Sequence, residues 1–201
     1  MSDTDEIRKP MPATPVLETA RLILRPKCLG DAPVVQKLFP QWEVVRYLAK
    51  APWPYPEGGA EHHIRECLDN MAKGLKCHWT ITLKAEGDDP IGGIDLWPET
   101  GGREQRGFWL ALDYHGRGLM TEAAERVTEF AFLDLGWPEL YLSNAVENKA
   151  SHRVKEKQGA KIVGYAPIDI VQGPTERVVW LLTREDWLAH RAGQAEAGPT
   201  P

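Results

Sequence analysis

The spacing of hydrophobic residues along the first part of the chain changes repeatedly between strand-like and helical. Apolar and polar residues alternate over residues 18–26, which end at a proline, and this pattern predicts a strand. Helical spacing follows in three segments, at residues 31–39, 42–48 and 61–73. Between the last two segments, residues 51–59 contain three prolines, which hold the chain extended and predict a stiff aromatic loop.

Three short apolar runs come next, at residues 78–84, 90–97 and 107–112. The gaps between them are short and rich in turn-forming residues, so the runs predict an antiparallel meander. An amphipathic helix then starts at Gly118 and stops at Gly136, and a strand is expected at residues 139–144. Because this strand follows a strand and a helix, we expect a parallel crossover.

The last part of the chain predicts a helix, two strands and a further helix. Asn148 is expected to cap the first helix, which ends at Gly159. The strands are expected at residues 161–171 and 176–183, and the final helix at residues 184–191.

The length of 201 residues fits one domain, which we place at residues 16–190 between flexible tails at residues 1–15 and 191–201. The composition, 42% hydrophobic and 26% charged, is that of a globular protein. No apolar run is long enough to span a membrane, and the first residues lack the apolar region of a secretory signal. The net charge of −5 argues against a general nucleic-acid partner.

Three cysteines, Cys28, Cys67 and Cys77, are an odd number at unrelated spacings. This pattern argues against a disulfide framework and favours a reducing compartment, for which the cytoplasm is the default. Histidines lie near two of the cysteines, but the chain contains neither a paired C-x-x-C nor an H-x-x-x-H motif. We therefore expect no metal site.

Residues 110–123, with the sequence LALDYHGRGLMTEA, form the strongest candidate for a ligand site. An apolar run ends there, Gly116 and Gly118 bracket Arg117, and helical spacing begins. Glycines at such a turn let the backbone approach a ligand closely, and the unpaired amides of a first helical turn bind anions. Packing punctuation between a strand and a helix looks the same, so this segment alone leaves both interpretations open. Neither the dinucleotide motif G-x-G-x-x-G nor the triphosphate motif G-K-[ST] is matched.

Four segments in order resemble the GNAT family of N-acyltransferases, and within it the RimJ/RimL type. They are ETARLILRP at residues 18–26, PIGGIDL at 90–96, GFWLALDYHGRGLMTEA at 107–123 and NKASHRVKEKQGAK at 148–161. The resemblance covers residue 17 to about residue 187 and departs from the usual family pattern at Asp113, where glutamine or arginine is frequent. It implies an α+β GNAT fold in a single domain. The expected central sheet is mixed, with about seven strands in an antiparallel meander and then a parallel crossover, flanked by helices.

The resemblance also implies acetyl-CoA as the acyl donor, with no metal. The pyrophosphate of the cofactor would lie on the amides of Arg117, Gly118, Leu119, Met120 and Thr121. The pantetheine arm would pair like an extra strand with the backbone of Trp109, Leu110, Ala111 and Leu112. Arg153 is a candidate for a cofactor phosphate, although a solvated helix face explains it as well.

Acyl transfer to an amine needs a donor for the oxyanion and a proton for the leaving thiolate. The resemblance implies the backbone N–H of Leu110 for the first and Ser151 for the second. Many family members carry a tyrosine acid seven residues after Asn148, where this chain has Lys155. Asn148 and Ser151 are expected to contact the cofactor, and capping of a helix is a compatible role for both.

Asp95 is the leading candidate for the general base, because a carboxylate on that strand can contact the amine or a water beside it. Alternation alone does not tell which face each side chain takes, so five alternatives stay open: His78, Glu99, Glu104, Asp113 and His115. The acceptor is expected to contact an aromatic wall that includes Trp53, Tyr55 and Trp97.

The resulting hypothesis is an acetyl-CoA-dependent N-acetyltransferase that moves an acetyl group to a primary amine by direct attack in a ternary complex. The amine would belong to a protein N-terminus or to a small molecule. The alternative is a module of the same fold that binds acyl-CoA without turnover, as a sensor or partner protein. The expected partners are acetyl-CoA and the amine acceptor, and a homodimer stays open because dimers are common among similar proteins.

Overall fold

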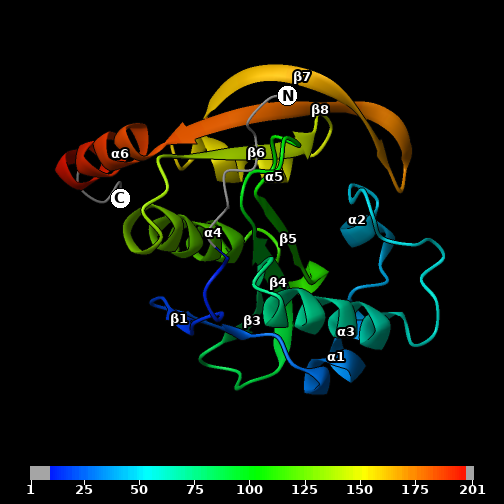
Figure 1. Cartoon of the computed structure of the whole chain (residues 1–201). Helices are drawn as coiled ribbons and strands as arrows, with labels where there is room; N and C mark the ends of the chain where they lie inside the picture. Colours follow the sequence, from blue (N-terminus) through cyan, green and yellow to red (C-terminus); the bar gives the residue numbers. More distant parts are fainter. Residues whose placement is uncertain (1–9, 198–201) are drawn as a thin grey trace, which may run out of the picture.

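Two antiparallel sheets form the framework of the protein, which is seen in a computed structural model that describes residues 10–197 (Figure 1). The five-stranded sheet has the order β1 (Leu17–Glu18), β2 (Leu22–Pro26), β3 (Cys77–Leu83), β4 (Pro90–Leu96) and β5 (Arg106–Leu110). The three-stranded sheet has the order β6 (Glu139–Ala145), β8 (Gly173–Thr183) and β7 (Lys161–Ile170).

Six α-helices accompany the two sheets within the described residues: α1 (Ala32–Leu38), α2 (Trp42–Val45), α3 (Gly59–Ala72), α4 (Leu119–Glu129), α5 (Lys149–Glu156) and α6 (Arg184–Ala197). Short 3-10 turns precede α1 and α4, at Leu29–Asp31 and Leu112–Tyr114. Helix α4 continues into a π-helical turn, η3 (Phe130–Asp134). The predicted strands and helices are therefore present in the predicted order, with shifted ends.

The main core lies between α4 and one face of the five-stranded sheet. Trp79 of β3 packs edge-on against Phe130 at the end of α4, with ring centroids 5.7 Å apart. Ile81 and Ile94 share this face and are fully buried, as the period-two pattern of a strand requires. On the other face, α1 and α3 form a smaller apolar cluster with β5, and Figure 1 shows α3 and α4 on opposite sides of the sheet.

The two sheets are joined where β5 and β6 begin. The Gln105 N–H donates to the carbonyl oxygen of Tyr141 (2.9 Å), and the Tyr141 N–H donates to the Gln105 side chain (2.8 Å). Within residues 10–197, no further backbone hydrogen bond joins these strands. Because β5 and β6 separate beyond this contact, they leave a gap between the two sheets.

This gap is the main difference from the expected sheet. Instead of one mixed sheet of about seven strands, residues 10–197 form eight strands in two sheets, and each of these sheets is antiparallel throughout. The extra strand arises because a turn divides the first predicted strand into β1 and β2. Helix α4 does connect β5 to β6 as expected, but these strands share one contact rather than a ladder.

Parts of the expected tails are ordered. Met11 is buried, and its N–H donates to the carbonyl oxygen of Gly74 (2.8 Å), while the indole of Trp79 donates to the carbonyl oxygen of Pro15 (2.6 Å). Helix α6 continues to Ala197 instead of ending near residue 191. The remainder of both predicted tails, residues 1–9 and 198–201, lies outside the described residues. Between these ends, the structure has no helix long and apolar enough to cross a membrane.

Candidate active site

The glycine turn after β5 presents a run of main-chain amides without partners. Gly116 and Gly118 adopt φ angles of 74° and 75°, in the left-handed region that favours glycine, and Gly118 caps the N-terminus of α4. No described residue accepts a hydrogen bond from any amide of residues 116–121. The positive end of α4 lies at the same place, so the turn has the geometry of an anion site.

Contacts from the β1–β2 turn hold this glycine turn in place. The Glu122 carboxylate accepts hydrogen bonds from the Thr19 hydroxyl (2.6 Å) and from the Arg21 N–H (2.9 Å) and Nε (2.7 Å). Arg21 Nη1 also donates to the carbonyl oxygen of Arg117 (3.0 Å). Burial would raise the pKa of Glu122, but the hydrogen bonds from Thr19 and Arg21 outweigh it and lower that pKa. Sequence reasoning missed Arg21, which lies about a hundred residues before the turn it supports.

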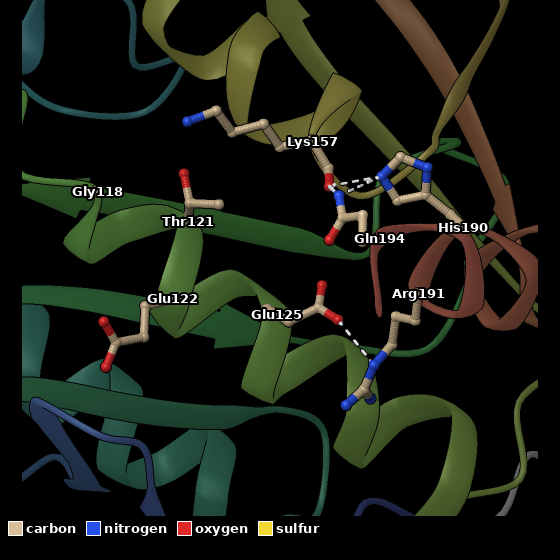
Figure 2. Close-up of a pocket in the computed structure, with 8 residues that line it drawn as sticks. All are labelled: Gly118, Thr121, Glu122, Glu125, Lys157, His190, Arg191 and Gln194. Carbon is tan, nitrogen blue, oxygen red and sulfur yellow. Dashed lines mark hydrogen bonds and ion pairs between the residues drawn. The ribbon is translucent and has the colours of Figure 1, made fainter. Parts of the chain in front are cut away.

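A cavity of about 610 Å³ opens beside the turn, between α4, α5 and α6 (Figure 2). Gly118 and Thr121 line one end of it, and Figure 2 shows the Lys157 side chain extended over that end, while Arg191 lies at the other. Arg153 does not line this cavity, but it is exposed one helical turn before Lys157 on the same side of α5. Lys157 is therefore a candidate phosphate ligand that sequence reasoning missed.

The register of β4 and β5 shows which backbone groups of β5 face the gap. Ala111 N–H donates to the carbonyl oxygen of Ile91 (2.8 Å), and the Gln105 carbonyl accepts from Trp97 N–H (2.9 Å). Because backbone groups alternate in direction along a strand, Trp109 also turns toward β4, whereas Phe108 and Leu110 turn toward the gap.

Fewer of residues 109–112 than predicted therefore have backbone groups free to pair with a ligand. Trp109 and Ala111 direct their backbone to β4, and Leu112 belongs to a 3-10 turn. The backbone of Leu110 faces the gap, and no described residue accepts from its N–H. Its carbonyl oxygen accepts from Nε2 of His115 (2.9 Å), so this nitrogen of His115 carries the proton.

The start of α5 brings Ser151 to the other side of the gap. The Asn148 side chain accepts a hydrogen bond from Ser151 N–H (3.1 Å), which confirms the predicted cap. Ser151 is buried, and Lys155 Nζ lies 2.7 Å from its hydroxyl oxygen. The same ammonium lies 5.4 Å from the ring centroid of Phe108 on β5. The Lys155 side chain therefore lies between Ser151 and β5, the strand on which the Leu110 N–H is unpaired among the described residues.

Asp95, the expected base, is held by two cationic groups on the α3 side of the sheet. Its carboxylate lies 2.8 Å from Nδ1 of His78 and 3.9 Å from Nζ of Lys27. Burial would raise the pKa of Asp95, but Lys27 and His78 outweigh it and hold that pKa well below its usual range. Burial would lower the pKa of His78, and Asp95 raises it to about 9 instead. A carboxylate stabilised in this way is a weak base.

Cys67 of α3 lies in the same buried cluster. Its sulfur is 3.4 Å from Nε2 of His63 and 3.8 Å from Nζ of Lys27. Burial would raise the pKa of the thiol, but the hydrogen bond with His63 and the nearby His78 and Lys27 lower it to about 6.

Glu104 is placed at the base of the gap. Its carboxylate accepts a hydrogen bond from the Ser143 hydroxyl of β6 (2.7 Å), and within residues 10–197 it forms no ion pair. It lines a cavity of about 590 Å³ together with Trp97. Glu99, in contrast, accepts a hydrogen bond from the N–H of Arg103 (3.1 Å), which lies in the same loop. Asp113 lies on the exposed 3-10 turn before α4.

The three aromatic residues expected around the acceptor lie in different surroundings. Tyr55 packs on Phe39, which packs on Trp109, with centroids 5.1 Å apart in both pairs. Trp53 is 45% exposed and packs against Trp42, and Trp97 lies in the cavity with Glu104. The structure therefore brings only Trp97 next to a candidate base.

The described residues contain no cluster of three or more histidine, cysteine or acidic side chains that could hold a metal ion. All three cysteines fall within this part of the chain and are free thiols.

Comparison with known proteins identifies the fold that carries this site. Residues 21–161 match the acetyltransferase (GNAT) domain family. A probable N-acetyltransferase, YjcK of Bacillus subtilis, is 30% identical over 115 residues, which are 56% of this chain and 63% of that protein. The match thus spans less than two thirds of this curated relative.

Solved structures agree on the fold. A GNAT acetyltransferase of Bacillus anthracis superposes with a TM-score of 0.73 at 20% identity, over 85% of this chain and 99% of that one. RimJ of Mycobacterium smegmatis, solved with CoA-disulfide, superposes with a TM-score of 0.76 at 14% identity, over 90% of this chain and 94% of that one. Acetyltransferases of this family use acetyl-CoA. The gap between the sheets, the glycine turn and the matched residues lead to one conclusion: this chain belongs to the GNAT acetyltransferase family.

Proposed function

We propose that the protein is an acetyl-CoA-dependent N-acetyltransferase that transfers the acetyl group directly to a primary amine in a ternary complex. The observation that carries this proposal is the run of unpartnered amides at residues 116–121, which begins a few residues after the free edge of Leu110. Amides at a helix start bind a diphosphate without any metal. An extended pantetheine arm that pairs with the β5 edge then brings its thioester into the gap.

The groups around the gap suit attack of an amine on a thioester. The N–H of Leu110 is the proposed donor to the oxyanion, and the hydroxyl of Ser151 is the proposed donor to the leaving thiolate. Glu104 suits the role of base better than Asp95 does, because no cation pairs with Glu104 among the described residues. Glu104 also shares its cavity with Trp97, which we propose as an acceptor contact.

For the acceptor we propose an amine handled by enzymes of the RimJ/RimL type, on a protein N-terminus or a small molecule. Support comes from the solved structures, which include a ribosomal-protein-S5-alanine acetyltransferase of Vibrio fischeri at 16% identity and a TM-score of 0.72. Ser151 in place of a tyrosine acid agrees with the same type.

We further propose that the protein works in the cytoplasm. We also propose that it assembles as a homodimer, which light scattering would test.

The test is an acetylation assay with the full-length chain. Acetyl-CoA is mixed with N-terminal peptides of ribosomal proteins, amino acids, polyamines or aminoglycosides, and free CoA thiol and product mass are both measured. We expect amine-dependent release of CoA and a product heavier by one acetyl group. Binding of CoA without amine-dependent release for any of these acceptors would contradict the enzyme and favour a binding module without turnover.

A further inference from the structure

Lys155 is a buried cation without a counterion. Only 2% of the surface of Lys155 is exposed to solvent. Among residues 10–197, the ammonium donates hydrogen bonds only to the Ser151 hydroxyl (2.7 Å) and the Ser151 carbonyl oxygen (3.4 Å), and no carboxylate forms an ion pair with it. Buried lysines are rare unless they are paired, because removal of the charge from water is not compensated.

The charged neighbours of Lys155 increase this cost. Arg106 of β5 is also buried, and its guanidinium donates to neutral groups, the Thr128 hydroxyl (2.7 Å) and the Gln158 side chain (2.8 Å). Burial and then Arg106 lower the pKa of Lys155 well below 10.5, and only Glu104 opposes them. Burial lowers the pKa of Arg106 to about 10, and the carboxylate of Glu125 on α4 opposes this shift.

An apolar side chain would fill this position at lower cost, so packing does not explain the lysine. Its ammonium instead donates a hydrogen bond to Ser151, which carries the one hydroxyl of α5. The face of Phe108, at the free edge of β5, closes the site on the other side. The ammonium of Lys155 thus lies between Ser151 of α5 and Phe108 of β5.

We propose that Lys155 and Ser151 form a proton relay in which Lys155 supplies the proton that Ser151 delivers to the leaving sulfur. The relay rests on the acetyl transfer proposed above. Because Lys155 acts through Ser151, it is a positioning residue rather than a group in contact with the substrate.

The step balances in atoms and electrons. The amine nitrogen attacks the thioester carbon, a C–N bond forms, and the carbonyl electrons move onto the oxyanion. The oxyanion electrons then re-form the C=O bond as the C–S bond breaks, and the sulfur leaves with its electron pair and takes the hydroxyl proton of Ser151. Ser151 takes a proton from the ammonium of Lys155. The proton lost by the amine passes to Glu104 and the solvent, from which Lys155 is protonated again.

The acidity of the two groups suits this transfer. A free alkyl ammonium is a weaker acid than a thiol, whose ordinary pKa is about 8.5. Burial and Arg106 lower the pKa of Lys155, so its ammonium is a stronger acid than a free alkyl ammonium, which favours donation of its proton.

The first test is Lys155→Met, which keeps length and volume but removes the charge. We expect kcat to fall by about tenfold or more, with an unchanged KM for acetyl-CoA. Wild-type kcat should decline as pH rises through the pKa of Lys155, below 10.5, and this alkaline decline should be absent from the variant. The midpoint of thermal unfolding should rise, because a buried, uncompensated charge is removed.

The controls separate the relay from a structural role. Lys37→Met changes an exposed helical lysine and should leave kcat, pH profile and stability unchanged. Ser151→Ala should lower kcat about as much as Lys155→Met, and the double variant should be no slower than either. NMR titration of Lys155 in the wild-type protein needs no substitution and should show a pKa below 10.5.

The outcomes distinguish the relay from the proposed function. A wild-type chain that releases CoA, together with a Lys155→Met variant of unchanged kcat and pH profile, would overturn the relay alone. An ordinary pKa for Lys155 in the titration would also overturn it. A wild-type chain without amine-dependent release would overturn the proposed function and the relay with it.

Discussion

Arg21 pairs with Glu122 at 2.7 Å, and the same guanidinium donates to the carbonyl oxygen of Arg117 inside the glycine turn. The side chain of Arg21 is 49% exposed, so the ion pair itself adds little stability. Its hydrogen bond to Arg117 instead restrains the turn whose amides face the proposed diphosphate.

Arg21→Ala is therefore expected to raise the KM for acetyl-CoA by about threefold to tenfold, through a looser turn, with kcat nearly unchanged. The unfolding free energy should change by less than about 1 kcal/mol. Arg65→Ala is the matched control, because Arg65 also forms an exposed ion pair (2.6 Å, with Glu61) but lies on α3. Equal effects of the two substitutions on the KM would contradict a specific role for Arg21.

Gly118→Val should weaken CoA binding by about tenfold or more, because a left-handed residue with a side chain costs about 1–2 kcal/mol and shifts the adjacent amides. Gly87→Val is the control, since Gly87 has a φ of 91° and nothing within 4 Å of an added Cβ. Both variants should lose similar stability, and only the first should lose affinity in calorimetry. Normal affinity of Gly118→Val would remove the glycine turn from the cofactor site.

The glycine turn was predictable because a helix start and its glycines leave a local signature in the sequence. The cap at Asn148 was predictable for the same reason. The register was not: alternation alone did not show that Asp95 lies opposite His78 or that Trp109 turns toward β4. The support from Arg21 joins segments far apart in the chain, and no local pattern encodes such a contact.

The base should be identified by a pair of substitutions. Glu104→Gln removes a carboxylate that accepts from Ser143 but pairs with no cation among the described residues, so kcat/KM for the amine should fall by about a hundredfold. Asp95→Asn should lower stability, since it removes the partner of His78 and Lys27, but should change kcat/KM by less than about tenfold. Steady-state kinetics at saturating acetyl-CoA checks both values, and the reverse order would restore Asp95 as the base.

The cluster of Cys67 and His78 should make stability nearly independent of pH between about 6.5 and 9. The pKa of His78 is raised to about 9, so its contribution is complete below its ordinary pKa and is lost as pH rises to 9. The pKa of Cys67 is lowered to about 6, so its contribution grows over the same interval. Between these pH values the folded protein holds more protons on His78 and fewer on Cys67 than the unfolded chain does, so the two contributions cancel.

Cys67→Ser removes the second contribution and the smaller of the two causes that raise the pKa of His78, while the larger cause, Asp95, stays in place. The unfolding free energy of this variant should therefore fall as pH rises from 6.5 to 9, by on the order of 2 kcal/mol. Urea unfolding at several pH values measures this slope, and His63 and Lys27 stay in place in both proteins. A variant with the same pH dependence as the wild type would show that Cys67 is not a thiolate.

Calorimetric titration of the wild-type protein with CoA and with pantetheine tests most directly whether the free amides of residues 116–121 bind a diphosphate. Pantetheine keeps the amide-bearing arm but lacks the diphosphate. We predict saturable binding of CoA and binding of pantetheine weaker by about a hundredfold or more, because several charge-assisted hydrogen bonds are lost. Failure of CoA to bind, or equal affinity for both molecules, would contradict the account.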